Sequence, residues 1–176
     1  MNSYSELNMS MSQLVNMLKS SNQLIHEISV TVNGTSMEPF LHDGQDSVIF
    51  SYLPKRIRRG DILLFRRKNG SFAMHRVYSI GKNGTVSFLG DNQSVVEKNI
   101  LPEDIILYVP TVIRNGKKIN CTHGFWRFVM TCYMKARVKH PATANRVFRF
   151  LRRVMRAIIN PRNSIGKLKK ILFNDK

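Results

Sequence analysis

The sequence predicts a mainly β protein with a coiled antiparallel β core, a short N-terminal helix and a basic α-helical C-terminal extension. Between about residues 28 and 120, short runs of alternating apolar and polar residues are separated by Asn-Gly pairs. Alternation with a period of two is typical of half-buried strands, and Asn-Gly fits tight hairpin turns. After residue 120 the apolar spacing becomes helical and basic residues accumulate. We therefore divide the chain into residues 1–27, 28–120 and 121–176.

The first region is expected to be one short helix that packs on the core. Apolar residues recur at roughly helical spacing between residues 5 and 26. They are Leu7, Met11, Leu14, Val15, Leu18 and Leu24.

The central region is expected to form an antiparallel meander of strands. It opens with Ile28, Val30 and Val32 alternating against polar neighbours. Two Asn-Gly pairs, at 69–70 and 83–84, lie between convincing strands and predict hairpins, and two more lie at 33–34 and 115–116. The predicted strands are 28–32, 46–52, 61–66, 71–80, 85–89 and 105–114.

The C-terminal region carries most of the net charge of +17. Residues 121–176 hold 14 Lys and Arg against 1 Asp, whereas residues 1–120 hold 14 against 10 acidic residues. An amphipathic helix is predicted over 145–159, and a second basic helix follows, capped by Ser164. We expect the apolar faces of these basic helices either to pack on the core or to lie on an anionic membrane surface. Nucleic acid or an acidic protein is the less favoured partner.

Composition also limits the cellular setting and the cofactors. The sequence has no run of eighteen apolar residues and no signal-peptide pattern at its start, so we expect a cytoplasmic protein, either free or peripheral on the inner face of the membrane. Two cysteines are too few for a disulfide framework. Cys121, His123 and Cys132 are too few ligands for a zinc site, so no metal or other cofactor is expected.

Three short strings contain residues suited to nucleophilic catalysis. Ser36 follows a strand in a turn opened by Asn33-Gly34, which would give its hydroxyl a rigid position beside backbone N–H groups. His75, in the strand 71–80, is the best candidate for a general base near neutral pH. Asp91, in the turn Gly90-Asp91-Asn92, would hold one ring nitrogen of that base.

The order of these motifs resembles the type I signal peptidase superfamily, which also contains the self-cleaving repressors of the bacterial SOS response. The resemblance covers residues 28 to about 120 and rests on Gly34-Thr35-Ser36-Met37-Glu38-Pro39, Gly60-Asp61-Ile62, His75-Arg76-Val77 and Gly90-Asp91-Asn92. Most bacterial members use lysine as the base, and a histidine here is similar to the endoplasmic-reticulum and archaeal branch.

The resemblance implies a coiled β core of signal-peptidase type and a set of site residues. Ser36 would be the nucleophile, His75 the base and Asp91 the acid, with the Ser36 N–H helping to hold the oxyanion. Met37 and Pro39 would contribute to oxyanion and substrate binding, and Glu97 lies near the place of a second acid.

These residues predict a serine endopeptidase that cleaves a peptide or precursor protein through an acyl-enzyme. Three alternatives stay open: a member that has lost activity, a non-enzymatic membrane- or nucleic-acid-binding adaptor that uses the basic helices, and a repressor-type autoprotease. Fewer than thirty residues precede Ile28, and we expect these to be too few for an independent DNA-binding domain.

Overall fold

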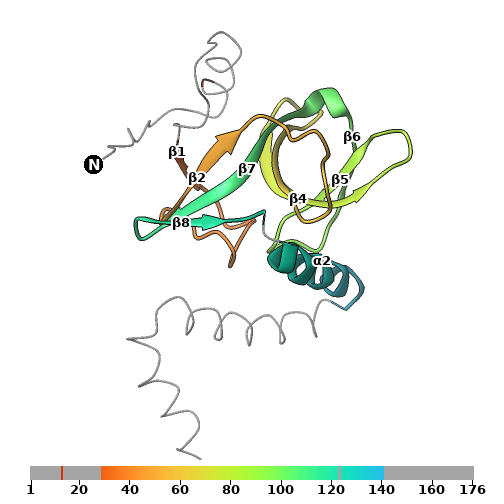
Figure 1. Cartoon of the computed structure of the whole chain (residues 1–176). Coiled ribbons are helices and arrows are strands. Elements are labelled where there is room, and N and C mark those ends of the chain that lie inside the picture. Colours follow the sequence, from red (N-terminus) through yellow and green to blue (C-terminus); the bar gives the residue numbers. More distant parts are fainter. Residues whose placement is uncertain (1–12, 14–28, 123, 141–176) are drawn as a thin grey trace, which may run out of the picture.

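The described residues form one strongly coiled antiparallel sheet with a single α-helix beneath it (Figure 1). The computed structural model describes residues 13, 29–122 and 124–140. The strand order is β1-β2-β7-β3-β4-β5-β6, and β8 pairs with β7. The strands are β1 (Ser29–Thr31), β2 (Asp46–Ser51), β3 (Ile62–Arg66), β4 (Phe72–Ile80), β5 (Val86–Leu89), β6 (Glu97–Ile100), β7 (Ile105–Arg114) and β8 (Lys117–Asn120). The prediction of a mainly β antiparallel core is confirmed.

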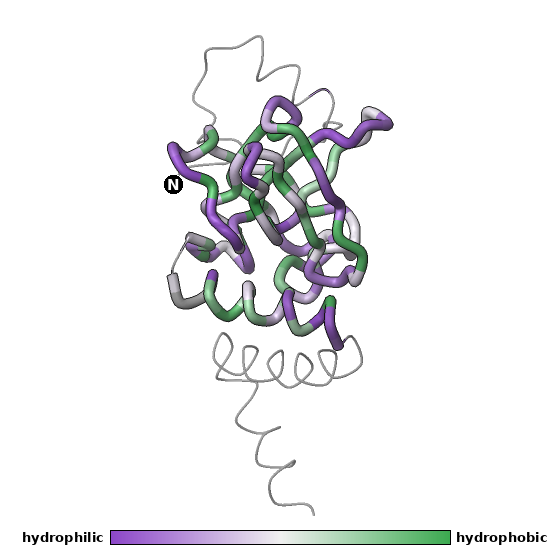
Figure 2. The backbone as a smooth tube through the Cα atoms, turned by 90° about the vertical axis from the view of Figure 1, so that its right-hand side faces the viewer, coloured by the Kyte–Doolittle hydropathy of each residue, from purple (hydrophilic) through white to green (hydrophobic). Residues whose placement is uncertain are grey.

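The helix α2 (Gly124–Lys139) lies against one end of the β core in both Figures 1 and 2. A short 3-10 helix, η2 (Pro102–Asp104), precedes β7. The predicted helices over 5–26 and 145–159 and after Ser164 fall outside the described residues, apart from the single residue Gln13. Within the ranges described above, no helix is long and apolar enough to cross a membrane.

All six predicted strands are present, and each end lies within one residue of its prediction. Two strands were not predicted, β6 and β8, because their sequences are mostly polar and partly exposed and show no apolar alternation. The fourth Asn-Gly pair does make a turn, with φ of 49° at Asn115 and 71° at Gly116. Because two consecutive positive φ values suit a tight hairpin, this turn leads β7 directly into β8.

The strand β3 separates two hydrophobic clusters. Ile62 and Leu64 pack into the cluster beneath β1, β2 and β7, whereas Leu63 and Phe65 pack into a second cluster with β4, β5 and β6. A strand buried on both faces reads as a continuous apolar run, which is why 62–65 shows no alternation. This central strand carries β4 on one side, and β4 bears His75.

The second cluster should dominate the stability of the β4–β5 side. The rings of Phe65 and Phe88 stack with their centroids 4.1 Å apart, and the Phe88 side chain is 0% exposed. We expect Phe88→Ala to lower the free energy of unfolding by about 3–5 kcal/mol, through lost burial and the cavity left behind. Phe128→Ala on α2, where the side chain is 67% exposed, is the matched control and should cost about 0.5 kcal/mol or less. Denaturant unfolding measures both, and equal losses would contradict this assignment of the core.

Candidate active site

Ser36 lies in the turn between β1 and β2 and is held from two sides. Met37, which is 2% exposed, packs into the first hydrophobic cluster and anchors the turn. The carbonyl oxygen of Ser36 accepts a hydrogen bond of 2.8 Å from the N–H of Asn92. Gly34 has φ of 101° and donates its N–H to Asp43 Oδ1 at 2.8 Å. The Ser36 backbone is therefore fixed while its side chain stays partly accessible.

His75 meets Ser36 across 39 positions of sequence. It lies in β4 opposite Leu63, is 2% exposed, and its Nε2 is 3.1 Å from Ser36 Oγ. The ring of Phe65 lies beside the imidazole, with centroids 5.9 Å apart. The structure thus brings together the hydroxyl and imidazole that the sequence suggested.

The carboxylate on the other side of the imidazole belongs to Glu97. His75 Nδ1 lies 2.9 Å from Glu97 Oε1, although the ring N–H is not aligned well enough to make a regular hydrogen bond. Arg67 donates hydrogen bonds to both oxygens of Glu97, from Nε to Oε2 at 2.6 Å and from Nη2 to Oε1 at 2.8 Å. A bidentate guanidinium fixes a carboxylate in its plane. Glu97 is therefore held against the imidazole.

The charges of these neighbours decide which ring nitrogen carries the proton. The hydrogen bond from Arg67 lowers the pKa of Glu97, so Glu97 is ionised near neutral pH and can only accept. Nδ1, which faces it, must then carry the ring proton. Burial lowers the pKa of His75 despite the opposing effect of Glu97, so the ring is neutral near pH 7. Nε2 is left with a free lone pair that faces the Ser36 hydroxyl.

Asp91 occupies a different position from the predicted one. It is completely buried, and both of its carboxylate oxygens accept from Arg76 Nε, at 2.8 and 3.0 Å. Since the two ring nitrogens of His75 face Ser36 and Glu97, Asp91 does not hold the imidazole. The predicted contact is wrong because the neighbouring residue in β4, Arg76, points to the opposite face and needs a buried counter-ion.

The Gly90-Asp91-Asn92 motif still serves the site, but through its backbone. The Asn92 N–H holds the Ser36 carbonyl, and a Cβ added at Gly90 would come within 2.7 Å of that same oxygen. Only a glycine allows this close approach. The motif therefore seats the Ser36 turn against the end of β5.

A pocket of about 510 Å³ opens beside Ser36 and His75. Met37 also lines it, while Pro39 is half-buried in the same turn and does not reach it. The side chains of Arg67 and Gln93 add polar groups to its wall. The apolar lining includes Val30, Val32, Val48, Phe50, Leu64, Phe72 and Met74. Ser36 Oγ and His75 Nε2 thus lie at the wall of a hollow that both apolar and polar groups line.

Arg67 was not anticipated from the sequence. It lies in a basic turn before Asn69-Gly70, where an arginine is an ordinary surface residue, and no local pattern links it to a residue 30 positions away.

The residues that have been placed contain no group of three His, Cys, Asp or Glu side chains suited to a metal ion. Cys121 is buried and Cys132 exposed, and His123 lies outside the described residues.

The electrostatic arrangement around His75 can be tested by NMR titration of its imidazole. We expect His75 to titrate below its ordinary value of 6.5, because burial disfavours the charged ring. Glu97→Gln should lower its pKa further, since the carboxylate is the chief group that opposes the burial effect. Glu103→Gln, an exposed residue of η2, is the matched control and should leave the titration unchanged. A higher pKa in Glu97→Gln would contradict the pairing.

A protein-family model described as Peptidase S24-like matches residues 6–109, which is 104 of the 176 residues and includes Ser36, His75 and Glu97. No curated protein matches the chain. The matched segment spans β1 to β6 and the first half of β7 but ends before β8 and α2. The chain belongs to the Peptidase S24-like family of serine peptidase domains.

Proposed function

We propose that this protein is an active serine endopeptidase with Ser36 as nucleophile, His75 as general base and Glu97 as the acid that orients the base. The observation that carries the proposal is the 3.1 Å approach of His75 Nε2 to Ser36 Oγ, with an ionised carboxylate on the far ring nitrogen. Hydroxyl, imidazole and carboxylate in this order are the parts that acyl transfer by serine needs.

Each part has a defined step in the proposed reaction. His75 Nε2 takes the Ser36 proton as Oγ attacks the peptide carbonyl, and backbone N–H groups of the Ser36 turn hold the oxyanion. His75 then gives that proton to the leaving amine, and water hydrolyses the acyl-enzyme by the same route. Glu97 stabilises the imidazolium that forms in each step, and Arg67 keeps Glu97 in place.

Membership of the family does not decide whether the general base is a lysine or a histidine, so the base is inferred from the residues of this chain. The self-cleaving repressors and most bacterial signal peptidases use lysine, and β4 carries His75 at the corresponding place. A lysine needs a dry site to lose its proton, whereas an imidazole is neutral near pH 7 without that help. The Arg67–Glu97 pair beside His75 supports a histidine mechanism, which resembles the endoplasmic-reticulum and archaeal branch.

The proposed substrate is an extended peptide segment of a precursor protein. The strand β1 is an end strand of the sheet and lines the pocket beside Ser36, so a peptide can add to its edge by backbone hydrogen bonds. The apolar lining favours uncharged side chains near the cleaved bond. Resemblance to signal peptidases narrows these to small residues before that bond.

The partner of the basic C-terminal region remains a prediction. Of residues 121–176, the structure describes 121, 122 and 124–140, so packing on the core and binding to an anionic surface are both still open for the rest. The adaptor alternative is separated from the enzyme by the cleavage experiment below. The repressor alternative would require cleavage of the chain itself rather than of an added peptide.

Cleavage of a diverse peptide pool, read by mass spectrometry, tests the mechanism. We expect Ser36→Ala and His75→Ala to abolish cleavage, and Glu97→Gln to lower kcat by about 10²- to 10⁴-fold because the base loses its partner. Asp91→Asn separates the two acids. It should act on stability, by about 3–5 kcal/mol, since it leaves the buried Arg76 without its counter-ion. Cleavage that survives in Ser36→Ala and His75→Ala would overturn the proposal.

The pH dependence follows from the neutral imidazole. The free enzyme is active when His75 is deprotonated, so kcat/KM should rise with pH through the pKa of His75, with a midpoint below 6.5. In Glu97→Gln the midpoint should move to lower pH while the plateau falls. A rise centred well above pH 8 would point to a lysine base instead.

A further inference from the structure

We propose that Arg137 and Tyr133 of α2 are positioning residues that hold Ser36 in its reactive place through the 91–93 turn. The inference rests on the proposed role of Ser36 as nucleophile. Both residues lie outside the segment that matches the family model, so this support is added by the C-terminal part of the chain.

Side chains of α2 donate hydrogen bonds to three consecutive backbone carbonyl groups, those of residues 91–93. The Tyr133 hydroxyl donates to the carbonyl of Asp91 at 3.1 Å. Arg137 donates from Nη2 to the carbonyl of Asn92 and from Nε to the carbonyl of Gln93, each at 2.7 Å. A further bond of 2.7 Å from Arg137 Nη1 to the Tyr133 hydroxyl joins the two side chains into one unit.

The opposite side of the same turn faces the reaction centre. The Asn92 N–H donates to the Ser36 carbonyl at 2.8 Å, and Gln93 lines the pocket with Ser36 and His75. Gly90 packs so closely on the Ser36 carbonyl that a side chain there would collide with it. A shift of the turn must therefore move the Ser36 backbone or open the pocket wall.

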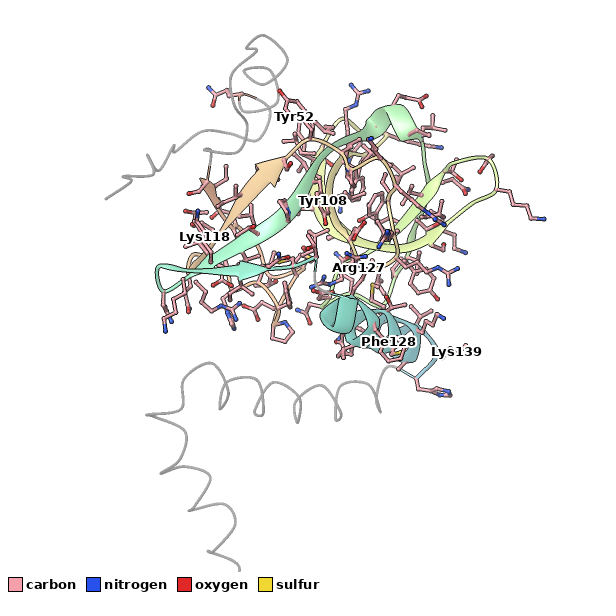
Figure 3. The ribbon with its side chains drawn as sticks, viewed as in Figure 1. Tyr52, Tyr108, Lys118, Arg127, Phe128 and Lys139 are labelled. Carbon is pink, nitrogen blue, oxygen red and sulfur yellow. The ribbon has the colours of Figure 1, made fainter. Side chains whose placement is uncertain are left out.

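The geometry at the other end of α2 supplies an internal comparison. Arg127 lies 3.2 Å from Asp61 and donates to the Thr122 carbonyl, and it packs on Gly60 rather than on the 91–93 turn. Figure 3 shows Arg127 where the first turn of α2 meets the β core and Lys139 at the opposite end of the helix. One end of the helix thus docks to the fold, and the other end docks to the turn behind Ser36.

Hydrogen exchange and kinetics on the full chain test the inference together. Arg137→Gln should speed exchange of the Asn92 amide by about tenfold, because the turn loses two backbone contacts. The same variant should lower kcat by about tenfold to a hundredfold with KM within about twofold, since a displaced nucleophile affects the reaction more than binding. Arg137→Lys should restore part of the rate, and Tyr133→Phe, which deletes one bond, should show a smaller effect in the same direction.

Two controls separate positioning from general stability. Lys139→Gln removes an exposed cation from the same helix and should change neither readout. Arg127→Gln loosens the other end of α2 and should lower Tm without changing exchange at Asn92. Unchanged exchange at Asn92 in Arg137→Gln, or rate losses in Arg127→Gln and Arg137→Gln that simply follow their Tm values, would overturn the inference.

The outcome also distinguishes this inference from the proposed function. If wild type cleaves no peptide while Arg137→Gln still speeds exchange at Asn92, the proposed activity fails and the coupling between α2 and the Ser36 turn stands. If wild type is active and Arg137→Gln matches it in both exchange and kcat, the peptidase proposal stands and the positioning role is excluded.

Discussion

The side chain of Arg76 is 2% exposed and joins four parts of the chain that are distant in sequence. From β4 it bonds the Asp91 carboxylate and the Gly60 carbonyl, and it lies 4.2 Å from the centre of the Phe40 ring. A buried cation must be paired, because an unpaired charge in a low-dielectric interior is very costly. This requirement fixes the turns before β3 and after β5 relative to the segment that follows Ser36. The site is assembled around that constraint.

Adjacent residues of one strand serve the two sides of this arrangement. Because side chains alternate along β4, Arg76 points to the Asp91 side and His75 to the Ser36 side. Each has its own carboxylate, and the two ion pairs differ in their surroundings. Asp91 is fully buried and structural, whereas Glu97 is partly exposed, is held by Arg67 and lies against the imidazole. One acid pairs with a buried cation of the core, and the other contacts the imidazole.

The helix α2, which lies outside the segment matched by the family model, contacts the same two places as Arg76. Arg76 bonds Gly60 and Asp91, and α2 docks at these two places, through Arg127 on one side and Tyr133 on the other. Strand pairing alone cannot fix the 91–93 turn, because it lies between β5 and β6 and outside both strands. The helix α2 stabilises this turn instead, through hydrogen bonds from Tyr133 and Arg137 to its three carbonyl groups.

The sequence by itself determined six of the eight strands, the hairpin turns at 69–70 and 83–84, and the pairing of Ser36 with His75, because each rests on a local pattern or an ordered set of motifs. Only the tertiary structure decided which carboxylate meets the imidazole. Asp91 lies in the turn after β5 and Glu97, six positions later, is the first residue of β6, and no local pattern shows which of them meets the imidazole. The choice depends on the alternation of β4 and on antiparallel pairing of β6 with β5, which places Glu97 opposite Phe88. The roles of Arg67 and Arg137 depend likewise on contacts 30 and 44 residues apart, which charge pattern and spacing along the chain do not encode.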